Sequence, residues 1–142
     1  MKYVVVVSLL LVSSVLNAAD KSFGDVLVSE VTSIYDADTF RVNIDDWPDI
    51  IGKRMSVRVL GVDAPEIRGK CKSEKQAARR AKQFTVEVLR SAKKIELRDI
   101  QRGKYFRILA HVYVDGINLS EKLIQAQHGR AYNGGSREGW CS

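Results

Sequence analysis

The sequence predicts a mainly β fold with helices (α+β), arranged as a small five-stranded Greek-key barrel with two or three helices. Three observations support this prediction: strand-like runs come first, one long amphipathic stretch interrupts them, and two further strand-like runs precede a second helical segment. A length of 142 residues suits one domain with a modest core rather than two domains.

The first three strands are expected at residues 25–34, 39–44 and 55–62. The first run is rich in Val and Ile, and the second alternates apolar with polar side chains, which is typical of a half-buried strand. Residues 45–53 contain Trp47-Pro48 and are expected to form a long hairpin loop between the second and third strands.

After the third strand the hydrophobic period changes to that of a helix. Ser73-Glu-Lys-Gln76 matches a capping box, and the apolar positions that follow predict an amphipathic helix over residues 73–92. Residues 95–98 and 107–114 return to strand character, and Asp115-Gly116 is a hairpin signal. A short strand and a second helix, opened by Ser120 and ended by His128-Gly129, complete a pattern typical of the OB fold.

Residues 1–19 have the features of a secretory signal peptide. Lys2 precedes an uncharged apolar run, and Asn17-Ala18-Ala19 supplies small residues for cleavage. The rival interpretation, a membrane anchor, is disfavoured because the run is shorter than the roughly 20 residues that a spanning helix needs. We therefore expect residues 20–142 to form the mature domain, periplasmic or secreted, without stable membrane association.

The charge and the cysteines indicate partners and compartment. A net charge of +6 favours an acidic partner such as nucleic acid, an anionic polysaccharide or a lipid surface, although basic charge also serves solubility. Cys71 and Cys141 are the only cysteines, and in an oxidising compartment such a pair is expected to form a disulfide. The bridge would tie the chain end to the region just after Glu66; free thiols or half of a metal site are the alternatives.

Three stretches concentrate polar side chains at strand ends: residues 35–39, 58–66 and 104–107. Carboxylates from separate segments, with few His or Cys nearby, favour a hard cation such as Ca²⁺ over zinc. Arginines beside such a site clamp a phosphate through paired N–H groups. Together these groups fit phosphodiester hydrolysis, although each stretch taken alone is more often a turn or a strand stop than a functional site.

In this order, the stretches resemble the staphylococcal (thermo)nuclease family, whose members are Ca²⁺-dependent secreted nucleases built on an OB barrel. The resemblance covers roughly residues 28–132 and rests on Asp-x-Asp-Thr, Arg-x-x-x-x-Asp-x-Pro-Glu, Lys-Tyr-x-Arg and the Tyr-x-Asp-Gly hairpin. The C-terminal sequence is similar to a Gram-negative and plasmid-associated branch of the family.

The resemblance implies a role for each matching residue. The metal ligands would be Asp38, Asp63 and the backbone carbonyl of Ala64; the catalytic groups would be Arg58 and Arg107, which bind the phosphate, and Glu66, which orients water. Lys104, Tyr105 and Tyr132 match positions that contact the nucleotide. The chain departs from the family at Ala37 and Phe106, where glycine is usual, so Phe106 is expected to alter the nucleotide pocket.

The activity that the resemblance implies is that of a Ca²⁺-dependent, sugar-nonspecific endonuclease that cleaves DNA and RNA as a monomer and leaves 3′-phosphate ends. Two alternatives stay open. One is a non-catalytic OB-fold module that binds nucleic acid, and the other is an exported domain that binds an anionic polysaccharide and needs no metal site.

Overall fold

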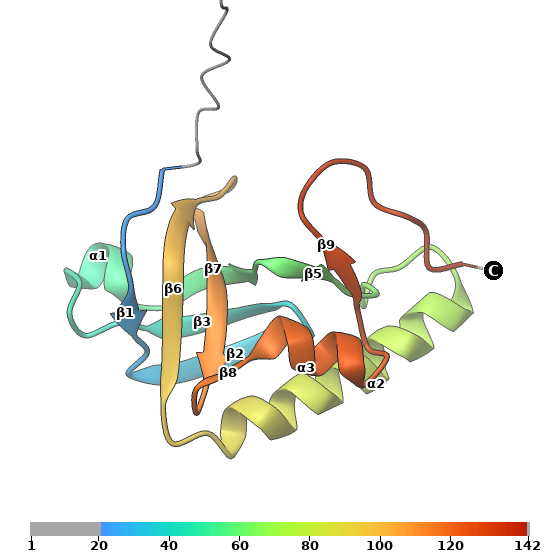
Figure 1. Ribbon diagram of the computed structural model, residues 1–142, viewed down its shortest axis with the longest axis horizontal. Coiled ribbons are helices and arrows are strands. Elements are labelled where there is room, and N and C mark those ends of the chain that lie inside the picture. Colours follow the sequence, from blue (N-terminus) through green and yellow to red (C-terminus); the bar gives the residue numbers. More distant parts are fainter. Residues whose placement is uncertain (1–20, 142) are drawn as a thin grey trace, which may run out of the picture.

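The computed structural model describes residues 21–141, so the expected signal peptide at residues 1–19 lies outside the described part. The strands are β1 (Val26–Leu27), β2 (Glu30–Asp36), β3 (Thr39–Asn43), β4 (Met55–Val59), β5 (Gly61–Asp63), β6 (Ile95–Arg102), β7 (Arg107–Val114), β8 (Ile117–Asn118) and β9 (Arg130–Tyr132). The helices are α1 (Asp49–Gly52), α2 (Lys72–Arg90) and α3 (Leu119–Gln125), as Figure 1 shows.

The main sheet has the strand order β1-β6-β7-β4-β3-β2, and β8 pairs with β7. Its pairs are antiparallel except for β4 and β7, which run parallel. The first strands link the two ends of this order, because Val28 donates its N–H to Ile95 of β6 while Ser29 donates to Asn43 of β3. The sheet is therefore curled into a half-barrel, which confirms the predicted α+β, OB-like architecture.

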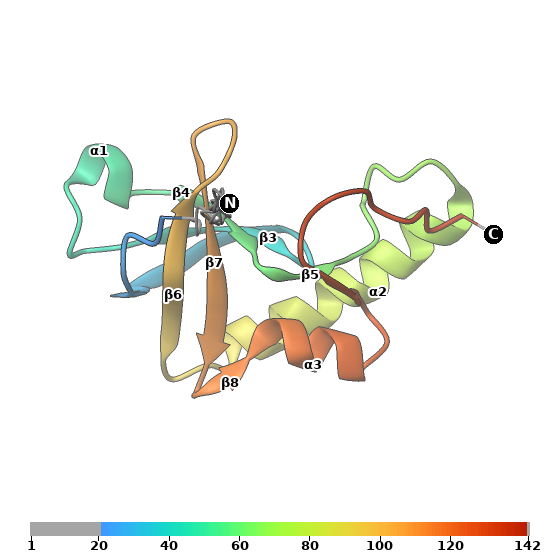
Figure 2. The same ribbon diagram turned by 45° about the horizontal axis from the view of Figure 1, so that its top comes forward.

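The core fills the inside of this curl. Alternate strand positions are fully buried, as period-2 patterning requires: Phe40, Val42, Val57, Val59, Leu97 and Val112. Helix α2 buries one stripe against β2, and α3 packs against β5 and β7 (Figure 2). Within residues 21–141, none of the helices has the length and apolar character needed to cross a bilayer.

The N-cap of helix α2 lies two residues before the expected one. Cys71 is the N-cap, and its sulfur accepts the N–H of Glu74 at 3.4 Å. The capping-box prediction at Ser73 is therefore wrong, because Ser73 already lies inside the helix. The polar residues do lie at the start of the helix, but the sequence pattern could not show that the neighbouring half-cystine, Cys71, takes the capping position.

The expected third strand is divided in two. β4 ends at Val59, and Gly61, with φ +89°, starts β5, which turns away to pair with the unanticipated strand β9. The expected hairpin loop also contains the short helix α1. The second predicted helix, α3, ends before the expected His128-Gly129, and Gln127 rather than a glycine takes the left-handed conformation after it, with φ 59°.

Candidate active site

The turn that carries Asp38 is fixed from below by α2. The hydroxyl of Thr85 donates to the carbonyl of Ala37 at 2.8 Å, and both residues are fully buried. Asp38 itself is only 2% exposed, although it is a carboxylate at the tip of a strand-to-strand turn. The sequence Asp36-Ala-Asp38 is therefore more than a solvated turn, since its second carboxylate is held inside the protein.

Arg58, Asp63 and Ala64 meet Asp38 from the neighbouring strands. Arg58 lies opposite Thr39 in the β3–β4 register, and its guanidinium is 2.9 Å from Oδ2 of Asp38 and 3.6 Å from Oδ1 of Asp63. The N–H of Ala64 donates to the same Oδ2 of Asp38 at 3.3 Å. Four of the residues expected in the site are thus in contact, although they come from three separate segments.

The buried carboxylates are not fully compensated by Arg58. Burial raises the pKa of Asp38 to about 6, and the nearby Arg58 only partly opposes that rise. Burial likewise raises the pKa of Asp36, although the N–H of Ile67 donates to it at 3.0 Å. The cluster therefore carries more negative charge than Arg58 alone balances, which favours a further positive group beside it, whether a side chain or a cation.

The oxygen atoms present fit a hard cation. Oδ1 of Asp63 is buried, and no residue of the described chain forms a hydrogen bond with it. A buried carboxylate oxygen that accepts no hydrogen bond, next to the Asp38 carboxylate and the Ala64 backbone, is the kind of donor set that Ca²⁺ takes. Asp38, Asp63 and the Ala64 carbonyl are the residues that would hold it.

Glu66 follows Pro65 in a loop that two carboxylates organise. The buried Glu74 accepts the N–H of Glu66 at 3.4 Å and that of Lys70 at 2.9 Å, and Asp36 accepts the N–H of Ile67. The Glu66 side chain is 45% exposed, so it faces the outside of the cluster.

The main surprise of the site is a contribution from the C-terminal tail. Arg137 donates from two nitrogens to Oε1 of Glu66, at 2.6 and 3.0 Å, and its Nε is 3.1 Å from Oδ1 of Asp63. The indole N–H of Trp140 donates to Oδ2 of Asp63 at 3.1 Å. Sequence reasoning missed both roles; the only signal was the cysteine pair, which indicated that the chain end lies near Glu66.

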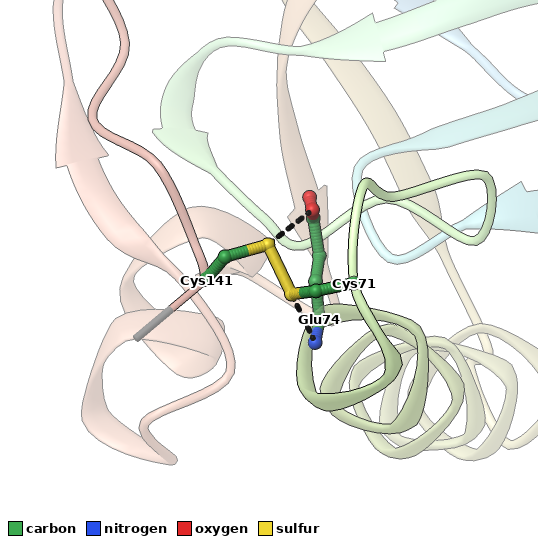
Figure 3. Close-up of side chains that lie close together, drawn as sticks. All are labelled: Cys71, Glu74 and Cys141. Carbon is green, nitrogen blue, oxygen red and sulfur yellow. Dashed lines mark hydrogen bonds between the residues drawn. A yellow bond between two sulfur atoms is a disulfide. The ribbon is translucent and has the colours of Figure 1, made fainter.

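A disulfide joins Cys71 to Cys141, the pair expected from the sequence, with the two Cα atoms 6.0 Å apart (Figure 3). Glu74 lies beside it, so the cluster Cys71, Glu74 and Cys141 has the proximity of a metal site. Because both sulfurs are used in the bond, neither can act as a thiolate ligand, and the cluster is structural.

Arg107 lies apart from the carboxylates. It is opposite Ser56 in the parallel β4–β7 pair, so it is two residues along the strand from Arg58 and on the same face of the sheet. Within residues 21–141 it forms no ion pair, and its Nε is buried without a hydrogen-bond partner. It lines a groove of about 350 Å³ together with Phe23, Trp47, Ile51 and Phe106.

The structure does not bring the three expected nucleotide contacts into the cluster. Lys104 and Tyr105 occupy the exposed turn between β6 and β7, where Tyr105 is 91% exposed. Tyr132 lies on β9 opposite Gly61, and its hydroxyl donates to the carbonyl of Gly135 at 2.7 Å. These side chains therefore surround the site at a distance or support its tail.

The comparison with known families agrees with this geometry. A family model described as "Staphylococcal nuclease homologue" matches residues 56–137, which is more than half of the chain. The match begins next to Arg58 and includes Asp63, Glu66 and Arg107, and it ends at Arg137.

Proposed function

The chain belongs to the staphylococcal nuclease homologue family, and on that premise we propose that it is a Ca²⁺-dependent, sugar-nonspecific endonuclease. It hydrolyses phosphodiester bonds of DNA and RNA and leaves 3′-phosphate ends. The observation that carries this proposal is the convergence of Arg58 on two buried carboxylates, at 2.9 Å from Asp38 and 3.6 Å from Asp63. Family membership indicates a nuclease-type hydrolase; the metal, substrates and products are the proposed refinements.

The two arginines bind the scissile phosphate. Arg58 and Arg107 lie on one face of neighbouring parallel strands, two residues apart along the strand, which is about 7 Å. Long guanidinium side chains at this separation can reach two oxygens of one phosphate group and take up negative charge as it develops. To do so, Arg58 must exchange part of its contact with Asp38 for the phosphate.

Glu66 aligns the attacking water and accepts its proton. One carboxylate oxygen of Glu66 is engaged by Arg137, while the other has no hydrogen bond within the described chain. Water attacks phosphorus and its proton passes to this carboxylate. The bond between phosphorus and the 5′ oxygen breaks, and the leaving oxygen takes a proton from solvent to become a 5′-hydroxyl. Asp38, Asp63 and the Ala64 carbonyl would hold Ca²⁺, and the ion would supply Lewis-acid polarisation of a phosphoryl oxygen.

The surroundings of the site support a polynucleotide substrate. The groove beside Arg107 is lined by aromatic side chains, among them Trp47 and Phe106, on which bases can stack without sequence preference. A basic flank near Glu66 is available for the phosphate backbone; its members are Lys70, Lys72, Lys75, Arg79, Arg80 and Lys82. Binding through such charges weakens as salt increases.

The location and organisation of the protein are part of the proposal. Residues 1–19 would act as a signal peptide, and residues 20–142 would be the mature, monomeric domain in the periplasm or outside the cell. The Cys71–Cys141 disulfide supports an oxidising compartment. The tail that carries Cys141 supports assignment to the Gram-negative and plasmid-associated branch.

The test is digestion of single- and double-stranded DNA and RNA, with Ca²⁺ or with chelator, by the parent and by Arg58→Ala, Glu66→Ala and Arg107→Ala. We expect each variant to lose at least about 100-fold in rate, as removal of a positioned charge or base does. Lys93→Ala is the matched control, because Lys93 is exposed just after the far end of α2 and its loss changes the net charge equally.

Two outcomes would overturn the proposal. A parent that binds polynucleotides but cleaves none, with or without Ca²⁺, would be the non-catalytic binding module. Parental rates in all three variants would mean that the cleaving site lies elsewhere.

A further inference from the structure

We propose that the C-terminal tail, residues 133–141, is part of the catalytic site, with Arg137 as a positioning residue for Glu66 and Trp140 as a positioning residue for Asp63. The inference rests on the proposed nuclease function and deepens it. Neither residue belongs to the motifs on which the family resemblance depends.

Arg137 controls the orientation of Glu66. The Glu66 side chain is 45% exposed, and among residues 21–141 only Arg137 forms a hydrogen bond or an ion pair with its carboxylate. Two guanidinium nitrogens donate to the same oxygen, Oε1, at 2.6 and 3.0 Å, which directs the second oxygen away from the arginine. A general base needs this fixed geometry, since a shift of about 1 Å can cost 100-fold in rate.

Trp140 orients Asp63 from behind. Its indole N–H donates to Oδ2 at 3.1 Å, while Oδ1 keeps no hydrogen bond within the described chain. The carboxylate is thereby turned so that Trp140 holds one oxygen, while the other has only the ion pairs with Arg58 and Arg137 and can take a cation as a ligand. Partners of this kind orient metal ligands in many sites, and their loss typically weakens metal affinity by about 10–100-fold.

The indole is itself held rigidly. The guanidinium of Arg130 stacks on the Trp140 ring at 3.8 Å from its centroid. The same side chain donates to the carbonyl of Gly139 at 2.9 Å. Arg130 belongs to β9, which pairs with the strand that carries Asp63, so the ring and its carboxylate partner are fixed on one framework.

The tail needs its covalent anchor to act in this way. Between β9 and Cys141 the chain has no helix or strand, and Gly134 and Gly135 both have positive φ. The tail is tied at one end by the β5–β9 pair and at the other by the disulfide to Cys71, at the start of α2. Such tethering presents Arg137 and Trp140 to the site at a high effective concentration.

The charge of Arg137 makes it possible to distinguish a positioning role from a purely structural one. Its Nε is 3.1 Å from Oδ1 of Asp63, so its positive charge opposes a cation at that oxygen. Removing the charge should therefore leave cation affinity unchanged or higher, while removing the hold on Glu66 slows the chemical step. A variant that only destabilised the fold would lose both cation affinity and catalytic rate.

The experiment measures kcat, KM and Ca²⁺ affinity by calorimetry without substrate, for the parent, Arg137→Gln, Arg137→Lys and Trp140→Phe. We expect Arg137→Gln to lower kcat by about 10–100-fold with little change in KM and no loss of Ca²⁺ affinity. Arg137→Lys should recover part of kcat, since Lys keeps the charge and one donor. Trp140→Phe, which keeps the ring but removes the N–H, should weaken Ca²⁺ binding about 10-fold.

Lys93→Ala is the control, because it removes one positive charge as Arg137→Gln does, while Lys93 is exposed just after the far end of α2 and outside the tail. A parental or higher kcat in Arg137→Gln would overturn the inference and make the tail a cover that obstructs the site. Equal Ca²⁺ affinity in Trp140→Phe would overturn its second half. A parent that cleaves nothing would instead refute the proposed function, and the calorimetry would still decide the role of Trp140.

Discussion

The two arginines proposed to bind phosphate lie on adjacent strands, yet their surroundings differ. Arg58 is 17% exposed and paired with the buried Asp38. Arg107 follows a turn in which Tyr105 is 91% and Phe106 74% exposed, and it forms no ion pair within residues 21–141. One half of the phosphate site is thus built when the protein folds, while the other half keeps its donors free for the substrate.

The two arginines differ because the segments that support them differ. The Arg58 side is supported by the Asp38 turn, which α2 holds through Thr85, and by β5 with Asp63. On the Arg107 side, two successive residues without glycine's freedom, Tyr105 and Phe106, adopt positive φ values of 58° and 52°. Such conformations cost about 1–2 kcal/mol per residue. The exposed turn that precedes Arg107 is therefore strained, whereas the segments around Arg58 are supported by buried contacts.

The largest expected effect is on stability when Arg58 is removed. Arg58→Ala leaves the buried Asp38 without its counter-charge, and breaking a buried ion pair on one side typically costs about 3–5 kcal/mol. Arg107→Ala breaks no ion pair within the described chain and should stay within about 0.5 kcal/mol of the parent. Urea unfolding in chelator measures both; equal losses would show that the two arginines are supported alike.

The next effect concerns the pH dependence of the buried half. Burial raises the pKa of Asp38 to about 6 in the folded protein, above its ordinary value of 3.8. The folded state therefore binds this proton more tightly than the unfolded state, so this group destabilises the protein increasingly as pH rises from about 4 to 6. Relative to the parent, the free energy of unfolding of Asp38→Asn should increase across this pH range by up to about 3 kcal/mol.

Unfolding free energies measured in chelator at pH 4 and pH 7 test this expectation. Asp45→Asn is the control, because Asp45 is an exposed carboxylate that pairs with Lys53 on the surface. If Asp38→Asn and the parent change equally between the two pH values, the carboxylate is solvated more than its burial indicates.

The smallest effect belongs to the exposed turn. Phe106→Gly should stabilise the protein by up to about 1 kcal/mol, because glycine adopts φ 52° without strain and the ring it removes is mostly exposed. Phe106→Ala removes the same ring but keeps the strain, so the difference between the variants isolates the backbone term. Thermal unfolding measures it, and a glycine variant less stable than the alanine variant would refute the strain.

Much of the fold could be predicted because its signals are local. Alternating side chains marked the strands, and the Asp115-Gly116 signal marked the hairpin that does form, with both residues at positive φ. The division of the third strand at Gly61 could not be predicted, because it depends on β9, a partner about 70 residues away.

The candidate site could likewise be predicted only for the residues that belong to local sequence patterns. Asp38, Arg58 and Asp63 stand at strand ends, where the barrel topology brings them together. Arg137, in contrast, has the sequence surroundings of an ordinary exposed arginine in a glycine-rich tail. Only the tertiary path from the disulfide back across the site gives it Glu66 and Asp63 as partners.

The parallel pairing of β4 with β7 has a consequence for folding kinetics. The two strands are separated in sequence by β5, α2 and β6, so their registry forms only after a long loop closes. Long-range parallel pairing of this kind is associated with slow folding. Arg58 and Arg107 are therefore aligned late in folding. A nascent chain that ends before β7 contains Arg58 and the carboxylates of the site but lacks Arg107.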